Sequence, residues 1–575
     1  MLSRLLTWLD QSGTHYWTVA WVTFGLVVAL AVVTALFPSP RRWWHHPGCF
    51  GALSLLAILA FRWPVLVYNS QLADPDESQL IAGALTLSQD PVYWRSVDGT
   101  THGPLADAPL LLPRLVGAPL DFTSARGVSV LLAWVTVLAA ASIFRSRVGE
   151  GWARLLVLPL LATFAFTHNW YFAQYGSEHA PAALLALGCA LLLTATPAAG
   201  RPRHRQLFLA GLLLGLVPFG KLQLAPMALW AATSAAAWVG FLSGEEARHR
   251  RRALAALATG AVTGPALLVG LVVATGSGPD FWDSYLVNNL QYAGSRWFTW
   301  RETPAKFLEL SEVAEGFSPF FFWVVGISAF GFLGWRRFDA WYRWATLFTA
   351  GLLLSAWYAT MAPGRMFMHY VQLLMFPAGL FGGMMGSALL QAETRFTSDT
   401  SRRMGCGAWL MVVVLAAGLA PQILWRAQTD FPLRNYYSVT HGALAQSEVA
   451  REILRHARPG ERMAIWGWMP TYWVETGLVQ GTRDGNCARQ LEPTPVRDRY
   501  RARFLADLRR LAPPVFVDAV GGDNFSYQDR TAHGHENFAE LRDYVGAQYR
   551  SAADVGGARI YVRRDRPAEA TPRKN

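Results

Sequence analysis

Long apolar runs alternate with short polar loops along the first 425 residues of the chain. A helix that crosses a bilayer needs about 20 apolar residues, because the hydrocarbon core is ~30 Å thick and each helical residue rises ~1.5 Å. The pattern predicts twelve membrane spans, at residues 18–37, 49–68, 127–144, 153–167, 180–197, 206–219, 222–242, 253–274, 317–335, 343–361, 367–390 and 405–425.

Basic clusters fall in alternate loops of this pattern. Threading the chain through twelve spans places six of them on one face: RRWWHH, FRSRVGEGWAR, RPRHR, EEARHRRR, WRRFDAWYR and the loop 391–403. By the positive-inside rule that face is cytoplasmic. The loop 69–126, the loop 275–316 and the C-terminal residues are then expected outside.

Composition supports a polytopic membrane protein, since 52% of the 575 residues are hydrophobic and only 16% are charged. The net charge of +12 lies mostly in the short loops, so it orients helices and does not indicate nucleic-acid binding. The four cysteines form no CxxC pair and no disulfide framework. We expect a membrane domain over residues 1–425 and a soluble domain over residues 426–575.

The C-terminal residues alternate helix and strand patterns, which predicts a small α/β domain with a partly parallel sheet. The segment HGHENF at 533–538 contains two histidines without further ligands at useful spacing, so loop residues are favoured over a zinc site. This domain is expected to cover the active site or position an acceptor.

Three acids stand in the stretch ADPDES, directly after the second span. Asp74 precedes a proline and is typical of a turn or a helix N-cap. Asp76 and Glu77 begin a short helix in the loop 69–126, where the helix dipole favours a carboxylate. A loop of this length beside a membrane is usually functional.

The loop and three later segments resemble the GT-C superfamily of polyprenyl-phosphate-dependent glycosyltransferases. The most similar branch includes the dolichyl-phosphate-mannose–protein mannosyltransferases and the lipid A aminoarabinose transferase. The matching motifs are Asp76-Glu77, Tyr93, Asp98, His102-Gly103-Pro104-Leu105, GKLQLAPMAL (220–229), GRMFMHYVQLLMFPAGL (364–380) and ERMAIWGWMPTYWVETGLVQGTR (461–483). The resemblance implies a GT-C-like protein of about eleven spans, so that 18–37 is an addition, with an extracytoplasmic α/β domain.

The chemistry of such an enzyme needs a base for the acceptor hydroxyl and cations for the departing phosphate. A carboxylate at the outer surface suits the base, and the resemblance points to Asp76. We count Glu77 with Asp76 as the second catalytic residue and assign it to hydrogen bonding or a metal. Lys221 is the first candidate for the phosphate, because a lysine in an apolar span is costly unless it is paired or hydrated. Arg365 is a second candidate for binding the donor phosphate, although it could equally be an anchor at the membrane interface. His102 is a third, where the lipid A branch typically carries a lysine.

Four further residues are candidates for acceptor or metal binding: Glu178, His179, His369 and Tyr93. Glu178 and His179 open a span, and ordinary helix-start chemistry explains them equally well. Glu178 with Asp76 offers oxygen ligands for a divalent cation, Mg²⁺ or Mn²⁺, so a metal is optional.

Together with the membrane topology, the resemblance implies an inverting membrane glycosyltransferase of the bacterial inner membrane. Its expected partners are a polyprenyl-phosphate sugar donor, membrane lipid and a cell-envelope acceptor (glycan, lipid or protein). Two alternatives remain: a flippase or secondary transporter of lipid-linked sugars, and a lipid-linked glycan ligase. A transporter is less favoured, because the chain has no internal repeat and its candidate charges gather at one surface.

Overall fold

The computed structural model describes residues 2–37, 42–67, 74–167, 170–196, 203–242, 246–314, 316–396, 407, 409–433, 439, 445–522 and 524–566. The chain forms two compact units. The membrane unit comprises Met1–Val67, Ser129–Gly270 and Leu290–His441. The α/β unit comprises Tyr68–Val128, Leu271–Asn289 and Gly442–Asn575.

This division differs from the boundary expected after residue 425, and the membrane unit extends to His441. The loop 69–126, expected in the membrane domain, groups with the C-terminal residues, and so does the segment 271–289. The reason is a set of long-range polar contacts to the C-terminal residues, such as the hydrogen bond from the backbone N–H of Asp98 to the carbonyl of Arg483, 2.8 Å long.

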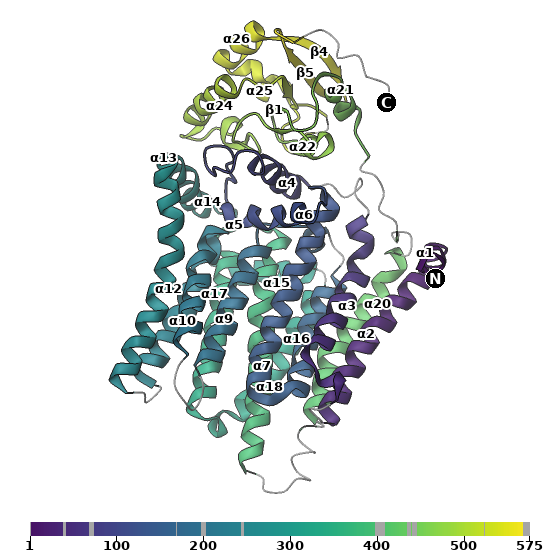
Figure 1. Ribbon diagram of the computed structural model, residues 1–575, viewed down its shortest axis with the longest axis vertical. Helices are drawn as coiled ribbons and strands as arrows, with labels where there is room; N and C mark the ends of the chain where they lie inside the picture. Colours follow the sequence, from purple (N-terminus) through teal and green to yellow (C-terminus); the bar gives the residue numbers. More distant parts are fainter. Residues whose placement is uncertain are drawn as a thin grey trace. The chain divides into compact units, whose positions relative to one another are not determined.

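The membrane unit is a bundle of long apolar helices (Figure 1). Its helices are α1 (Leu2–Asp10), α2 (Gly13–Leu36), α3 (Pro47–Val67), most of α7 (Phe122–Phe166), α8 (Trp170–Ala173), α9 (His179–Ala195), α10 (His204–Leu216), α11 (Ala225–Ala237), most of α12 (Ala247–Ala274), α14 (Asn288–Gly294), α15 (Thr303–Val313), α16 (Phe317–Leu333), α17 (Ala340–Met361), α18 (Gln372–Phe396) and α20 (Ala420–Leu433).

Each expected span overlaps one of these helices or its direct continuation, and 405–425 does so from residue 409 on. Helix α7 carries both 127–144 and 153–167, which are separated by Gly149 in a non-helical conformation with φ 80°. Among the described residues, seven helices are long and apolar enough to cross a membrane, or eight if the bent pair α15 and α16 forms one span. The chain is thus a multi-pass membrane protein.

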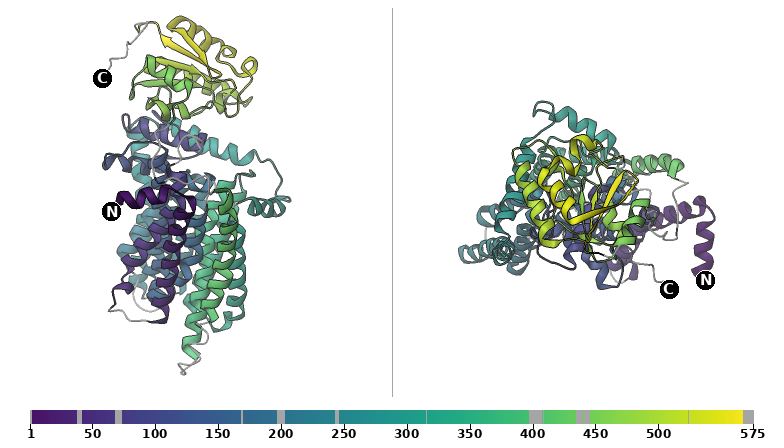
Figure 2. Two further views of the ribbon diagram at one scale, coloured as in Figure 1. Left: turned by 90° about the vertical axis from the view of Figure 1, so that its right-hand side faces the viewer. Right: turned by 90° about the horizontal axis from the view of Figure 1, so that it is seen from above.

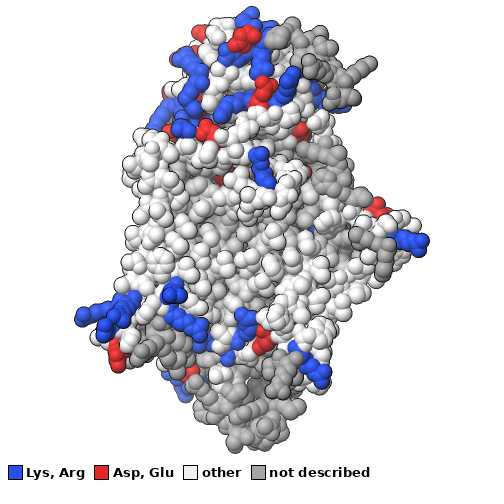
Figure 3. Space-filling model, in the orientation of Figure 1, with Lys and Arg blue, Asp and Glu red and all other residues white. Residues whose placement is uncertain are grey.

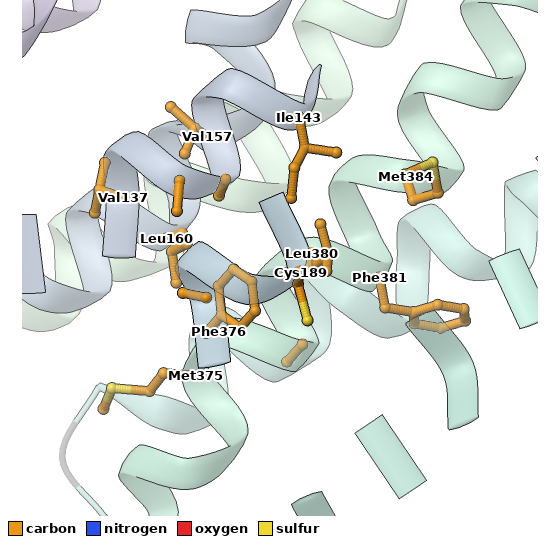
Figure 4. Close-up of a cluster of buried hydrophobic side chains, with 14 of the residues drawn as sticks. Val137, Ile143, Val157, Leu160, Cys189, Met375, Phe376, Leu380, Phe381 and Met384 are labelled. Carbon is orange, nitrogen blue, oxygen red and sulfur yellow. The ribbon is translucent and has the colours of Figure 1, made fainter. Parts of the chain in front are cut away.

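The core of the membrane unit consists of buried apolar side chains from many helices. Figure 4 shows part of it, where residues such as Leu160, Cys189 and Phe376 come from α7, α9 and α18. Lipid tails are as apolar as these side chains, so the hydrophobic effect does not drive the helices together within a membrane. Close packing between the helices stabilises their contacts instead. Gly211 of α10 and Gly260 of α12 illustrate this: a Cβ on either would lie 2.3 or 2.0 Å from a backbone oxygen of the other helix.

Basic loops of the membrane unit meet at one end, as the charge pattern predicts. Arg154 donates hydrogen bonds to the carbonyls of Trp44 (2.6 Å) and His46 (3.1 Å). Arg147 donates to the carbonyl of Thr196 (3.2 Å) and lies over the ring of Trp341. In Figure 3 the visible face of these helices is almost free of charged residues, with Lys and Arg gathered where α12 begins.

The α/β unit is built on a five-stranded sheet of order β2-β1-β3-β5-β4. Its elements are α4 (Pro75–Leu87), α5 (Pro104–Asp107), α6 (Leu112–Leu115), α13 (Gly278–Asp280), α21 (Glu448–His456), β1 (Arg462–Trp466), α22 (Thr471–Thr476), β2 (Val479–Gln480), α23 (Ala488–Leu491), α24 (Arg497–Leu511), β3 (Val515–Asp518), α25 (Arg530–His533), α26 (Ala539–Gln548), β4 (Tyr549–Val555) and β5 (Ala558–Arg563).

The sheet is partly parallel, as predicted. Strand β1 pairs in parallel with β2 and β3, and β5 pairs antiparallel with β3 and β4. Strands β4 and β5 form a hairpin (Figure 2) whose two turn residues, Gly556 and Gly557, have φ of 55° and 76°. A two-residue turn of this kind needs positive φ at both positions, which glycine adopts at no steric cost.

Candidate active site

Helix α4 begins with a carboxylate cap that separates the three acids of the ADPDES stretch. The Asp74 side chain accepts hydrogen bonds from the backbone N–H groups of Asp76 (2.8 Å) and Glu77 (3.2 Å), and Pro75 occupies the first helical turn. These are the donors that a helix leaves without partners at its start. The cap leaves Asp76 exposed and turns Glu77 inward, where it is fully buried.

Glu77 is held by a buried arginine. Arg126, in the first turns of α7, donates from Nη2 to Glu77 Oε2 (2.8 Å) and from Nε to the same oxygen (3.1 Å), and both side chains are 0% exposed. The role expected for Glu77 in catalysis stays a prediction. A metal at Glu77 would have to compete with the guanidinium group.

Tyr93 and His102 meet at a carboxylate that sequence reasoning missed. The Tyr93 hydroxyl donates to Asp107 Oδ2 (2.9 Å), and His102 Nε2 lies 3.2 Å from the same oxygen. Burial, and then the charge of Asp107, raises the pKa of Tyr93 well above its usual value, so the hydroxyl keeps its proton. One ring nitrogen of His102 therefore already contacts Asp107, and the expected binding of phosphate by His102 stays a prediction.

Asp98 joins the loop to the C-terminal residues through a buried ion network. Its Oδ2 accepts from Arg489 Nη2 and Arg503 Nη2, each at 2.8 Å, and both arginines also reach Asp484 Oδ1. Burial opposes ionisation of Asp98, but the two guanidinium groups outweigh it and hold its pKa far below the usual range. The Thr100 backbone N–H donates a further bond.

Helix α4 also contacts the C-terminal residues directly, and α22 lies beside it (Figure 1). Asn486 Nδ2 donates to Gln79 Oε1 (2.8 Å), and the Gln480 backbone N–H donates to Thr86 Oγ1 (3.0 Å). These bonds and the Asp98 network fix the orientation of the helix that presents Asp76.

The Asp98 network predicts acid sensitivity of the α/β unit. A second buried carboxyl, Asp507, accepts hydrogen bonds from Arg483. Burial raises the pKa of Asp98 and of Asp507, but neighbouring arginines outweigh it, so both folded pKa values are lowered. As the pH falls below about 4, these carboxyls protonate first in the unfolded state, so their contribution to stability is lost towards the lower folded pKa values. The protection factors of the β1 and β3 amides against hydrogen exchange should fall as the pH drops from about 5 to about 3. Unchanged protection factors over this range would contradict the network.

Lys221, in the membrane unit, is paired with one of the acceptor candidates. The chain leaves the helical conformation at Lys221, between two short 3₁₀ turns, Val217–Phe219 and Leu222–Leu224. Its Nζ forms a buried ion pair with Glu178 Oε1 and donates to Ser177 Oγ (2.9 Å). The ion pair offsets the unfavourable free energy of placing a lysine in an apolar segment.

A histidine and a tyrosine lie beside this pair. His369 Nε2 lies 3.8 Å from Glu178 Oε1, and Lys221 Nζ lies 5.0 Å from the centre of the Tyr370 ring. The Tyr370 hydroxyl lies 3.0 Å from that of Tyr292. The structure thus brings together Glu178, Lys221 and His369, which the sequence could only name separately.

Arg365 and His179 have other surroundings. Arg365 donates to Ser295 Oγ (2.8 Å) and lies over the rings of Trp297 and Tyr292, at 4.5 and 5.2 Å. Through Tyr292 it borders the Lys221 cluster. The His179 ring stacks on Tyr175, and its Nδ1 accepts from the Gly176 backbone N–H (3.0 Å), so it stabilises its own turn.

One group of possible metal ligands occurs among the described residues: Asp518, His535 and Glu536. Arg559 lies within it, donating from Nη2 to Asp518 Oδ2 (2.7 Å) and to Glu536 Oε2 (2.8 Å), and His535 Nδ1 is 2.6 Å from Asp518. The Arg559 guanidinium group balances the negative charge of these two acids, so we assign no metal ion to this cluster. Asp76 and Glu178 belong to different units, and a metal that joins them remains a prediction.

Sequence reasoning missed several residues that hold these side chains. Arg126 is the last residue of the predicted loop 69–126, and Arg62 lies inside the span 49–68, where its Nε donates to the Phe164 carbonyl (2.7 Å). A charge inside an apolar span is a signal that could have found Arg62. Arg126, Asp107 and Arg489 carry no such signal.

The comparisons with known proteins concern the fold. No family model and no curated protein sequence matches the chain. Among solved structures, it is similar to ArnT from Cupriavidus metallidurans bound to undecaprenyl phosphate, with a TM-score of 0.54 and 13% identity over 89% of this chain and 97% of that one. The chain has the ArnT fold.

The apo state of ArnT gives the same result, with a TM-score of 0.52, 12% identity, and coverage of 90% of this chain and 98% of that one. The similarity extends over nearly the whole ArnT chain, so both units are included. The expected fold, a polytopic helical membrane protein with a C-terminal α/β domain, is thereby confirmed. At this identity the ArnT fold does not carry over a substrate or a residue's role.

Proposed function

We propose that the protein is a membrane glycosyltransferase that moves a sugar from a polyprenyl-phosphate donor to a hydroxyl group of a cell-envelope acceptor. The ArnT fold supports this class, because ArnT itself was crystallised with undecaprenyl phosphate. We place the reaction at the outer face of the cytoplasmic membrane, following the positive-inside orientation.

The observation that carries the proposal is the exposure of Asp76. The neighbouring acids are engaged in the fold: Asp74 caps α4, Glu77 binds Arg126, and Asp98 binds two arginines. Asp76 is exposed on the first turn of a helix whose orientation is fixed. A rigidly positioned carboxylate is the group that general-base catalysis requires.

In the proposed reaction Asp76 takes the proton of the acceptor hydroxyl while its oxygen attacks the anomeric carbon. The bond from that carbon to the phosphate oxygen breaks, and polyprenyl phosphate leaves with the electron pair, inverting the configuration. Lys221, assisted by Arg365, would stabilise the developing phosphate charge. His369 and Glu178 would orient polar groups of the substrate.

A Lys221 variant tests the phosphate role apart from stability. Lys221→Met alone leaves Glu178 buried without its amine, so we pair it with Glu178→Gln, which removes both charges. The double variant should fold and bind polyprenyl phosphate about tenfold more weakly, the loss of one charge-assisted hydrogen bond. Binding can be followed by thermal shift in detergent.

The matched control is Lys306→Met with Glu309→Gln, an exposed pair in the same unit. It should bind the lipid as the wild type does. Equal binding by the Lys221/Glu178 variant would remove Lys221 from the phosphate site.

Proteoliposomes that contain a labelled polyprenyl-phosphate sugar distinguish the proposed transferase from a flippase. A transferase should cleave the donor when an acceptor is present and should leave intact donor on its original leaflet. Movement of intact donor without cleavage would replace the proposal with a transport function.

A further inference from the structure

Residues 480–490 of the α/β unit contain a concentration of buried polar atoms that have no hydrogen-bond partner within the described part of the chain. Four of the side chains are 0% exposed, and Arg489 is 8% exposed. The atoms are both amide atoms of Gln480 and of Gln490, Thr482 Oγ1, Asp484 Oδ2, and Arg489 Nε and Nη1. Buried polar groups in native proteins are almost always hydrogen-bonded, so this segment needs an explanation.

The chemical types of these atoms indicate the ligand. The two amides both donate and accept, the Asp484 oxygen accepts, and the Arg489 nitrogens donate. A phosphate would be repelled by Asp484, and a metal ion would be repelled by Arg489. Hydroxyl groups match, because each both donates and accepts, and a sugar offers several of them on a rigid ring.

The segment lies against the helix that carries Asp76. A Cβ placed on Gly485 would be 2.5 Å from Gln79 Cγ and 3.3 Å from Gln480 Nε2, so only glycine permits this approach to α4. Gln79 stands three residues after Asp76, about one helical turn away. The unpartnered Gln480 amide therefore lies beside the first turns of α4.

Residues of the stretch 93–102 contact this segment. Asp98 lies on Arg489, and the Trp94 carbonyl accepts from Arg483 Nη1 (3.0 Å). Trp94 and Thr100 have positive φ, 64° and 59°, which side-chain-bearing residues rarely adopt. Strain of this kind clusters at ligand sites.

We propose that residues 480–490 form a subsite for one sugar residue, with Gln480 and Gln490 as its main hydrogen-bonding groups. This proposal rests on the proposed function, in which the sugar belongs either to the donor or to a glycan acceptor. It assigns the C-terminal residues a direct part in substrate recognition.

Gln480→Met and Gln490→Met test the subsite in the full-length protein. Each removes unpartnered polar atoms at nearly constant volume, so the melting temperature should stay unchanged or rise. Gln548→Met, an exposed position in the same unit, is the matched control. The probe is a panel of free methyl glycosides, followed by saturation-transfer NMR on the detergent-solubilised protein.

We expect the wild type and Gln548→Met to bind at least one glycoside, and Gln480→Met and Gln490→Met to bind it about tenfold more weakly or not at all. Equal binding by all four proteins, or no binding by the wild type, would overturn the subsite. Either result leaves the transferase proposal to its own cleavage assay, so the two failures are distinguishable.

A second arm identifies the source of the sugar. The thermal shift given by polyprenyl-phosphate sugar is compared with that given by polyprenyl phosphate. If the difference is lost in Gln480→Met, the subsite holds the donor sugar. If the difference is retained while glycoside binding is lost, the subsite holds a sugar of the acceptor.

Discussion

Asp76→Asn should lower the turnover of donor by about 10²–10⁴-fold, the range typical for loss of a general base. Asparagine keeps the size of the side chain but cannot take a proton at neutral pH. The Asp74 cap uses the backbone N–H of residue 76 and is unaffected by the change. The variant should therefore fold normally and bind polyprenyl phosphate as tightly as the wild type.

The measurement is single-turnover release of polyprenyl phosphate, together with the thermal shift that the lipid produces. Asp90→Asn is a suitable control, because it changes the same chemical group in the same loop at a partly exposed ion pair with Arg95. It should retain most of the activity. Substantial turnover by Asp76→Asn would assign the base to another residue.

Glu77→Gln should destabilise the α/β unit by about 3–5 kcal/mol, because it leaves the fully buried Arg126 without its carboxylate. The effect should appear as a lower unfolding midpoint before any effect on the chemical step can be measured. Replacing both members, as Glu77→Gln with Arg126→Gln, should recover much of the loss, since no unpaired charge remains buried.

Arg95→Gln provides the comparison, since the Arg95–Asp90 pair is partly exposed and should contribute less than about 1 kcal/mol. The free energy of unfolding of the three variants is measured in denaturant, with hydrogen exchange of the α4 amides as the signal. A stable and inactive Glu77→Gln variant would contradict the structural role and return Glu77 to the catalytic residues.

The arrangement of spans could be predicted from the sequence because apolar runs of helical length are a local signal. The same holds for the helix at Asp76, whose start is encoded by Asp74 and Pro75, and for the alternation of helices and strands after residue 445. The break at Gly149 was also local, since polar residues separate the two apolar runs of α7.

The partners within the site could not be predicted, because they are distant in the sequence and have no periodic spacing. Asp98 binds two arginines, Arg489 and Arg503, that lie 391 and 405 residues further along the chain. Glu77 binds Arg126, which lies 49 residues further along. The same limit applied to Glu178 and Lys221, which the sequence identified separately. Their pairing changes the interpretation of Lys221 as a phosphate ligand, because the Glu178 carboxylate already balances part of the lysine charge.

The central claim is that the chain cleaves a polyprenyl-phosphate sugar, and the most direct test offers purified wild-type protein a panel of such donors. Free polyprenyl phosphate is measured with and without membrane extract as the source of acceptor. We predict release from one donor or a few, dependent on the extract. No release from any donor by well-folded protein, with extract present, would contradict the account.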